Sequence, residues 1–355
     1  MLYGIVAATS ALLLAAVLAA LLRLLALRLG VVERRRARAV PLLGGVAVVA
    51  VTAFVAGVGD WTDVAPLGPT AARLLAAGIG VGALGLVADL WPPPALLRVP
   101  LQAAVVTGAA ALTVPYDELG PVAGAVAVGW IALATHAFTS LDHADGVMGT
   151  VAVVTAFALS GCAAAEVMDG LAALLSVLSA ALTGFLMHNW PPARIVPGRC
   201  GALFVGFVLT SAAVLVHAGR AAGSSVGAAF ALTAVATADA VLVLVSRRRA
   251  GRPLLRGAPD HLVHRLRRLG VTPRGAAIVV GVTGFAGALV GMLIDMGWVS
   301  ATAALWVAGG ACVGVLALLR IPTYGGRHVP ASGSQLAEKP QVGPRLQAHL
   351  RVSKR

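Results

Sequence analysis

The sequence predicts an all-α, polytopic integral membrane protein, and three observations carry this prediction. Hydrophobic residues make up 59% of the 355 positions and charged residues only 12%, whereas soluble domains carry roughly a quarter charged residues. The apolar residues gather in runs that match membrane-crossing helices, which need about 20 residues each. These runs lack the alternation of a strand, and a lipid-facing sheet is therefore not expected.

About eleven apolar segments have the length of a membrane-spanning helix. The first resembles a secretion signal in position only, because its run is too long, no basic residue precedes Arg23 and basic residues follow it. We expect a membrane domain over 1–320 and a disordered, basic cytoplasmic tail over 321–355. The predicted spans lie near 3–30, 41–59, 72–90, 98–115, 121–137, 149–165, 170–188, 202–219, 225–245, 276–295 and 299–320.

The net charge of +13 is distributed in a way that predicts membrane topology and no nucleic-acid partner. If the N-terminus lies outside the cell, the inner loops are rich in arginine and the outer loops in acids, which is the positive-inside pattern. We therefore expect a multi-pass protein of the cell membrane with a cytoplasmic C-terminus. The outer acids are Asp60, Asp63, Asp117, Glu118, Glu166, Asp169 and Asp295, and the inner arginines include Arg34, Arg35, Arg36, Arg38, Arg98, Arg194 and Arg199.

Acidic residues stand at two of the predicted cytoplasmic helix ends. Three prolines at 92–94 end the third span and leave Asp89 at its mouth, where the carboxylate has a function or simply reaches water. Asp142 and Asp145 are three residues apart and share one face of a helical turn. Two close carboxylates repel each other unless a cation lies between them. This pair predicts a metal site, and a solvated acidic loop is the alternative.

Two further cytoplasmic segments offer groups that bind anions. Residues 188–202 place Asn189 and Arg199 in a glycine-flanked loop before a helix, where free backbone N–H groups suit an anion; ordinary helix capping also explains the glycines. Residues 256–270 gather histidines and arginines able to hold a diphosphate by charge-assisted hydrogen bonds. An amphipathic helix on anionic lipid is the alternative. The candidate residues of this second segment are Asp260, His261, His264 and Arg265.

Taken in order, these segments resemble the polyprenyl-phosphate N-acetylhexosamine-1-phosphate transferases, which are of the glycosyltransferase family 4 type. The resemblance runs from about 31 to 270 and depends on the ordered series more than on any one motif. The matching elements are Pro41-x-x-Gly44-Gly45, Gly85 to Trp91 with Gln102, Asp142-x-x-Asp145-Gly146, Gly184-Phe185-Leu186 with Asn189, Pro192 and Ala193, Asp239 before the arginines of 247–249, and Asp260 to Leu266.

The resemblance implies an enzyme that moves a sugar 1-phosphate from a UDP-sugar to undecaprenyl phosphate and releases UMP, for cell-envelope polysaccharide assembly. It implies Mg²⁺ as cofactor, held by Asp142 and Asp145. By the same resemblance, the catalytic residues are Asp89, Asp142 and Asp145, and the substrate ligands are Asn189, Arg199, Asp260, His261, His264 and Arg265. A homodimer is one option for its assembly.

The sequence also departs from the family pattern. Ala88 stands where the family has the first of two acids, and Arg199 stands where it has a magnesium-binding acid. His136 and Thr139 replace asparagines, and Val263 replaces a histidine. A guanidinium in place of a carboxylate inverts the local charge. Three functions therefore stay open: a transferase in which Arg199 neutralises the diphosphate, an inactive relative acting as a lipid-phosphate or nucleotide-binding scaffold or regulator, and a transporter or flippase.

Overall fold

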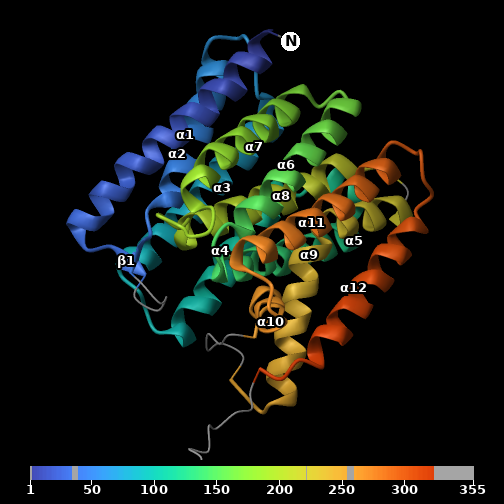
Figure 1. Ribbon diagram of the computed structural model, residues 1–355. Helices are drawn as coiled ribbons and strands as arrows, with labels where there is room; N and C mark the ends of the chain where they lie inside the picture. Colours follow the sequence, from blue (N-terminus) through green and yellow to red (C-terminus); the bar gives the residue numbers. More distant parts are fainter. Residues whose placement is uncertain (1, 34–38, 221, 254–259, 324–355) are drawn as a thin grey trace, which may run out of the picture. The chain divides into compact units, whose positions relative to one another are not determined.

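The computed structural model describes residues 2–33, 39–220, 222–253 and 260–323, which are almost entirely helical (Figure 1). Two short antiparallel strands, β1 (Val32–Glu33) and β2 (Val40–Pro41), pair between the first two helices. The helices are α1 (Leu2–Leu29), α2 (Gly44–Trp61), α3 (Gly68–Leu90), α4 (Ala95–Thr113), α5 (Tyr116–Ser140), η1 (Leu141–His143), α6 (Val147–Ala165), α7 (Asp169–Asn189), α8 (Gly198–His217), α9 (Ala222–Arg249), α10 (Leu262–Arg268), α11 (Pro273–Asp295) and α12 (Ala303–Leu319). The predicted all-α class is confirmed.

Ten of the described helices are long and apolar enough to cross a membrane, and α12 is a shorter apolar helix of 17 residues. They follow the order of the predicted spans, and the chain is a multi-pass membrane protein. The boundaries differ in places: α5 starts at Tyr116 and bends at Gly120, whose φ of 75° leaves the helical region. The predicted tail lies outside the described residues except for 321–323, and so does the arginine cluster at 34–38.

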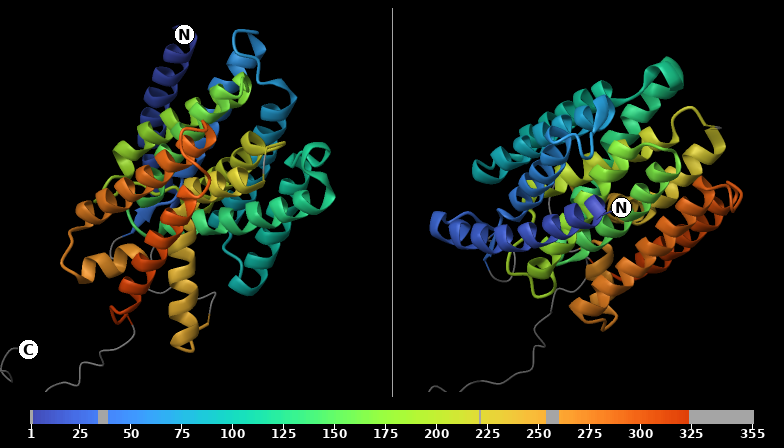
Figure 2. Two further views of the ribbon diagram at one scale, coloured as in Figure 1. Left: turned by 90° about the vertical axis from the view of Figure 1, so that its right-hand side faces the viewer. Right: turned by 90° about the horizontal axis from the view of Figure 1, so that it is seen from above.

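Helix α8 lies at the centre of the described packing. It contacts α2, α3, α5, α6 and α9, and its side chains are almost all buried. On one side α1 packs against α2 and α7, and on the other α11 and α12 pack against α9 (Figure 2). Because α8 begins at Gly198, beside the loop that carries several predicted site residues, this central helix fixes the candidate site relative to the membrane domain.

The start of α2 packs directly on the start of α8, and glycine makes this approach possible. A Cβ atom on Gly45 would collide with the main-chain nitrogen of Gly201 and the carbonyl oxygen of Pro197. Main-chain atoms cannot rotate away as a flexible side chain can, so the two segments would have to separate.

We expect Gly45→Ala to lower the free energy of unfolding by about 2 kcal/mol, because it overpacks this contact. Thermal unfolding of the purified protein in detergent measures the change. Gly57→Ala on the same helix is the matched control, because a Cβ there meets no atom within 4 Å. Equal melting temperatures for the two variants would show that the α2–α8 contact can relax without cost.

Candidate active site

The end of α3 meets the start of α8 through an ion pair. Arg199 donates from Nη1 to Oδ1 of Asp89 at 3.1 Å and to the carbonyl oxygen of Ala88 at 3.2 Å. The other carboxylate oxygen, Oδ2, accepts the backbone N–H of Cys200 at 3.1 Å. The Asp89 side chain is 1% exposed, whereas that of Arg199 is 32% exposed. The buried carboxylate therefore holds a guanidinium that still reaches solvent.

The loop before α8 is fixed by the entry to α2. Gly44 and Gly45 donate their backbone N–H groups to the carbonyl oxygens of Val196 and Pro197, at 3.0 and 2.9 Å. Val196 donates in turn to the carbonyl oxygen of Pro41 at 2.9 Å. Two segments that lie about 150 residues apart in the sequence are thus joined by main-chain hydrogen bonds. The Pro41-x-x-Gly44-Gly45 element supports the site without contributing a reactive side chain.

Asn189 and Asp145 brace the same loop from the other side. The Oδ1 atom of Asn189 accepts the N–H of Gly146 at 3.1 Å, and its Nδ2 donates to the carbonyl oxygen of Ile195 at 2.9 Å. Oδ2 of Asp145 accepts the N–H of Ala193 at 2.9 Å. Asn189 is 3% exposed. Its amide is engaged by main chain at both ends, which favours a positioning role over the predicted substrate contact.

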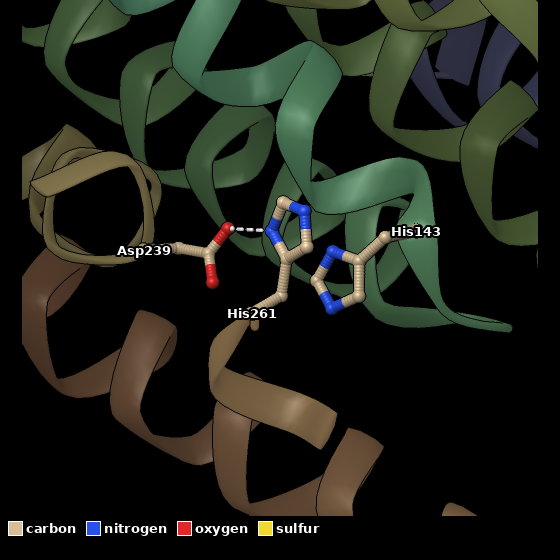
Figure 3. Close-up of side chains that lie close together, drawn as sticks. All are labelled: His143, Asp239 and His261. Carbon is tan, nitrogen blue, oxygen red and sulfur yellow. Dashed lines mark hydrogen bonds and ion pairs between the residues drawn. The ribbon is translucent and has the colours of Figure 1, made fainter. Parts of the chain in front are cut away.

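Three histidines gather where η1 faces the segment leading into α10. The ring of His261 stacks on that of His143, with centroids 4.0 Å apart and planes 15° apart, and the ring of His264 lies 5.2 Å from His143. Asp239, buried in α9, accepts from Nδ1 of His261 at 2.8 Å and from the N–H of Leu262 at 2.8 Å. Figure 3 shows the His261 ring between Asp239 and His143.

His264 lies outside the membrane-spanning helices. Burial lowers its pKa below the ordinary histidine value, and the neighbouring charges of His261 and Arg267 lower it further. The imidazole of His264 is therefore neutral near pH 7 and presents a lone pair.

Asp260 and Arg265 lie inside the protein. Asp260 is fully buried and accepts two hydrogen bonds from Arg247, from Nε at 2.8 Å and from Nη2 at 3.1 Å. Arg265 is 1% exposed, and its Nη1 donates to the carbonyl oxygens of Leu318 and Ile321 at 2.7 and 2.8 Å. The sequence predicts substrate contacts for both residues. The structure instead gives them internal partners that tie α9, α10 and the end of α12 together.

Comparisons with known proteins show the family of this chain. The family model described as "Glycosyl transferase family 4" matches residues 71–217. A Streptomyces coelicolor protein named "Putative glycosyltransferase SCO3672" is 62% identical over 328 residues, which cover 91% of this chain and 79% of that protein. The chain belongs to glycosyl transferase family 4.

Two more distant relatives carry more specific names. A Bacillus subtilis protein named "Probable undecaprenyl-phosphate N-acetylglucosaminyl 1-phosphate transferase" is 26% identical, covering 74% of this chain and 76% of its own length. The decaprenyl-phosphate N-acetylglucosaminephosphotransferase of Mycolicibacterium smegmatis is 28% identical, covering 73% of this chain and 74% of its own length. The family predicted from the ordered motifs is confirmed.

Magnesium, implied by the family resemblance, fits some of the predicted acids better than others. Asp142 and Asp145 are half-buried and carry the carboxylate oxygens that Mg²⁺ takes in proteins, often together with substrate phosphates. Asp89 fits poorly, because its two oxygens accept from Arg199 and Cys200. Among the described residues, His143, Asp239 and His261 each offer one possible metal-ligating atom, and these atoms lie within 4.8 Å of one another. This group includes neither Asp142 nor Asp145.

Two residues of this family 4 site were not predicted from the sequence. His143 lies between the two predicted metal acids in the sequence, and its ring lies close to the rings of His261 and His264. In the sequence Arg247 is one member of a basic cluster, whereas in the structure it is 7% exposed and pairs with Asp260. The signal for His143 was a histidine within the Asp142-x-x-Asp145 motif. For Arg247 no local signal separates it from its exposed neighbours Arg248 and Arg249.

Proposed function

We propose that this chain transfers N-acetylhexosamine 1-phosphate from a UDP-sugar to undecaprenyl phosphate at the cytoplasmic face of the membrane, in cell-envelope polysaccharide assembly. An oxygen of the lipid phosphate attacks the phosphorus that carries the sugar, and a new phosphoanhydride bond forms. The bond from that phosphorus to the bridging oxygen breaks, and UMP leaves with the oxygen and its electron pair. One observation carries the proposal. Hydrogen bonds bring Asp89, Arg199 and Asp145 together around the loop over 190–198, where α3 ends and α8 begins.

The residues present suit this reaction because phosphoryl transfer depends on positioning and charge neutralisation more than on covalent catalysis. Arg199 has a partly exposed guanidinium held by Asp89, and such a planar group binds two phosphate oxygens at once. We assign it to the diphosphate of the nucleotide. His261 and His264 lie beside the Asp142–Asp145 turn through their contact with His143. We assign them to the phosphates on that side.

Asp142 and Asp145 would hold Mg²⁺. When bound, the ion would neutralise phosphate charge as the new bond forms. The main-chain bonds of Asp145 and Asn189 to the loop over 190–198 keep this turn at a fixed distance from the start of α8. The arginine-rich loops of the predicted inner side support the cytoplasmic assignment.

One observation favours a second function, that of an inactive relative that binds lipid phosphate or nucleotide as a scaffold. Both oxygens of the Asp89 carboxylate accept hydrogen bonds, one from Arg199 and one from the Cys200 N–H. Ala88 offers no second acid. A carboxylate whose two oxygens already accept hydrogen bonds has little capacity left to hold a metal ion. The same residues would then bind their ligands without turnover.

An assay of UMP release separates the two functions. Purified protein, undecaprenyl phosphate and a panel of UDP-N-acetylhexosamines are combined with and without Mg²⁺, and we expect turnover that depends on Mg²⁺ and on the lipid. Asp145→Asn should lower the rate by about 100-fold, because it removes a metal ligand. Asp117→Asn, an exposed acid at the opposite helix ends, is the matched control and should match the native rate. Nucleotide binding without UMP release, for every sugar and metal tried, would establish the scaffold instead.

A further inference from the structure

Arg274 stands on the first turn of α11, at the level of the turn that precedes α6. The two helices pack together, and a Cβ atom on Gly281 would collide with the side chain of Thr150 on the first turn of α6. Gly284 faces Val154 further along, so the two helices run in the same direction. Arg274 precedes Gly281 by two helical turns, which span roughly 10 Å. The first turn of α11 therefore extends beyond the start of α6.

The side chain of Arg274 meets the loop that leads into α8. Its Nε atom donates to the carbonyl oxygen of Pro191 at 3.0 Å. Two residues further on, Ala193 donates its backbone N–H to Asp145. Pro191 also packs against Gly146, where an added Cβ atom would lie 3.0 Å from Cδ of the proline. The guanidinium of Arg274 is therefore held on a loop that directly contacts the turn carrying Asp145.

The contact with Pro191 leaves most donors of Arg274 unused. A guanidinium has several N–H donors, and within the described part of the chain the Nη atoms of Arg274 donate to no acceptor and pair with no carboxylate. The start of a helix also disfavours a positive charge. The positive-inside pattern explains a basic residue on this side of the membrane, but it does not explain why the guanidinium is fixed to this loop.

We propose that Arg274 is a further substrate-binding residue, and that its Nη atoms bind a phosphate group beside the Asp142–Asp145 turn. The bond from Nε to Pro191 holds the guanidinium in place, and the two Nη atoms form a planar pair of donors that suits two phosphate oxygens. This inference rests on the proposed function, which supplies two sources of phosphate. One is the phosphate of the lipid, and the other is the diphosphate of the nucleotide.

Ligand binding tests this assignment without turnover. The full chain, purified in detergent with Mg²⁺ present, is titrated with UDP by calorimetry, and its affinity for undecaprenyl phosphate is measured from the rise in melting temperature. We expect Arg274→Ala to weaken the binding of one of these ligands by about 10- to 100-fold, because it removes charge-assisted hydrogen bonds to a phosphate. Arg274→Lys should recover part of the loss, because it keeps the charge. The ligand that is weakened identifies the source of the phosphate.

Arg320→Ala is the matched control, because it removes an exposed arginine at the end of α12, and it should bind both ligands like the native chain. Arg274→Gln replaces the alanine variant if gel filtration shows that the latter fails to fold.

The proposal is overturned if Arg274→Ala keeps native affinity for both ligands, even with a lower melting temperature, because Arg274 would then only hold the loop. An equal loss in Arg320→Ala would also overturn it, since a general effect of charge would explain the result. UMP release by the native chain is measured separately. Its absence would overturn the transferase and leave the role of Arg274 to be judged from binding, whereas failure of the native chain to bind either ligand would overturn both.

Discussion

Arg199→Ala is expected to lower kcat/KM for sugar-phosphate transfer by about 100-fold, which corresponds to about 2.7 kcal/mol of transition-state stabilisation. The change removes the partly exposed guanidinium assigned to the diphosphate and leaves the buried Asp89 carboxylate with the Cys200 N–H. Arg199→Lys should recover part of the loss, because an ammonium keeps the charge but lacks the planar pair of donors. The rate of UMP release at several substrate concentrations measures both effects.

Arg194→Ala is the control for this prediction. Arg194 lies in the same loop, and its side chain is exposed. Removing it changes the net charge by the same amount without touching Asp89, so kcat/KM should stay within about twofold of the native value. If Arg199→Ala were as active as Arg194→Ala, the guanidinium would have no part in the reaction.

Arg247→Ala should lower the free energy of unfolding by about 3–5 kcal/mol, because it strands a buried carboxylate. Asp260 is fully buried and receives two hydrogen bonds from Arg247. Its own carbonyl oxygen accepts from Arg265 at 3.1 Å, so the damage should extend to the segment that carries the histidines. Chemical or thermal unfolding in detergent measures the loss.

Two comparison variants define the cause of that loss. Arg249→Ala removes an exposed arginine from the same helix and should change stability by less than about 0.5 kcal/mol. A double variant, Arg247→Met with Asp260→Leu, should recover much of the lost stability, since replacing both members of a buried ion pair with apolar groups is often neutral. Equal losses in the single and double variants would point to packing and not to the stranded charge.

The membrane helices could be predicted because the bilayer imposes one simple rule on them. A helix that crosses lipid needs a long apolar run whatever its neighbours are, and each of the first ten predicted spans contains most of one long helix. The ends were less predictable. The start of α5 depends on the local bend at Gly120. Helix α9 continues past the predicted end at 245 to Arg249, through arginines that a hydropathy criterion excludes.

The site was predictable in outline and not in its contacts. Successive membrane-spanning helices cross the bilayer in opposite directions. The order of the predicted spans therefore places Asp89, Asp145 and Arg199 on the same side of the membrane. Which side chains touch depends on tertiary packing that no sequence window contains. The motif spacing could not separate Asp260 and Arg265, which are buried among internal partners, from Arg199, which is partly exposed. It also gave no reason to pair His143 with His261, which lies 118 positions further along the chain.

The burial of α8 has a consequence for how the protein is made. In the folded state almost none of this helix meets lipid, so its strongly apolar sequence is not needed for contact with the bilayer. It is needed earlier, when the translocation machinery must release each new segment sideways into the membrane. Four of the helices that surround α8, namely α2, α3, α5 and α6, precede it in the chain, and α9 follows it. When α8 leaves the ribosome, most of its final neighbours are already in the membrane, and α9 completes its enclosure.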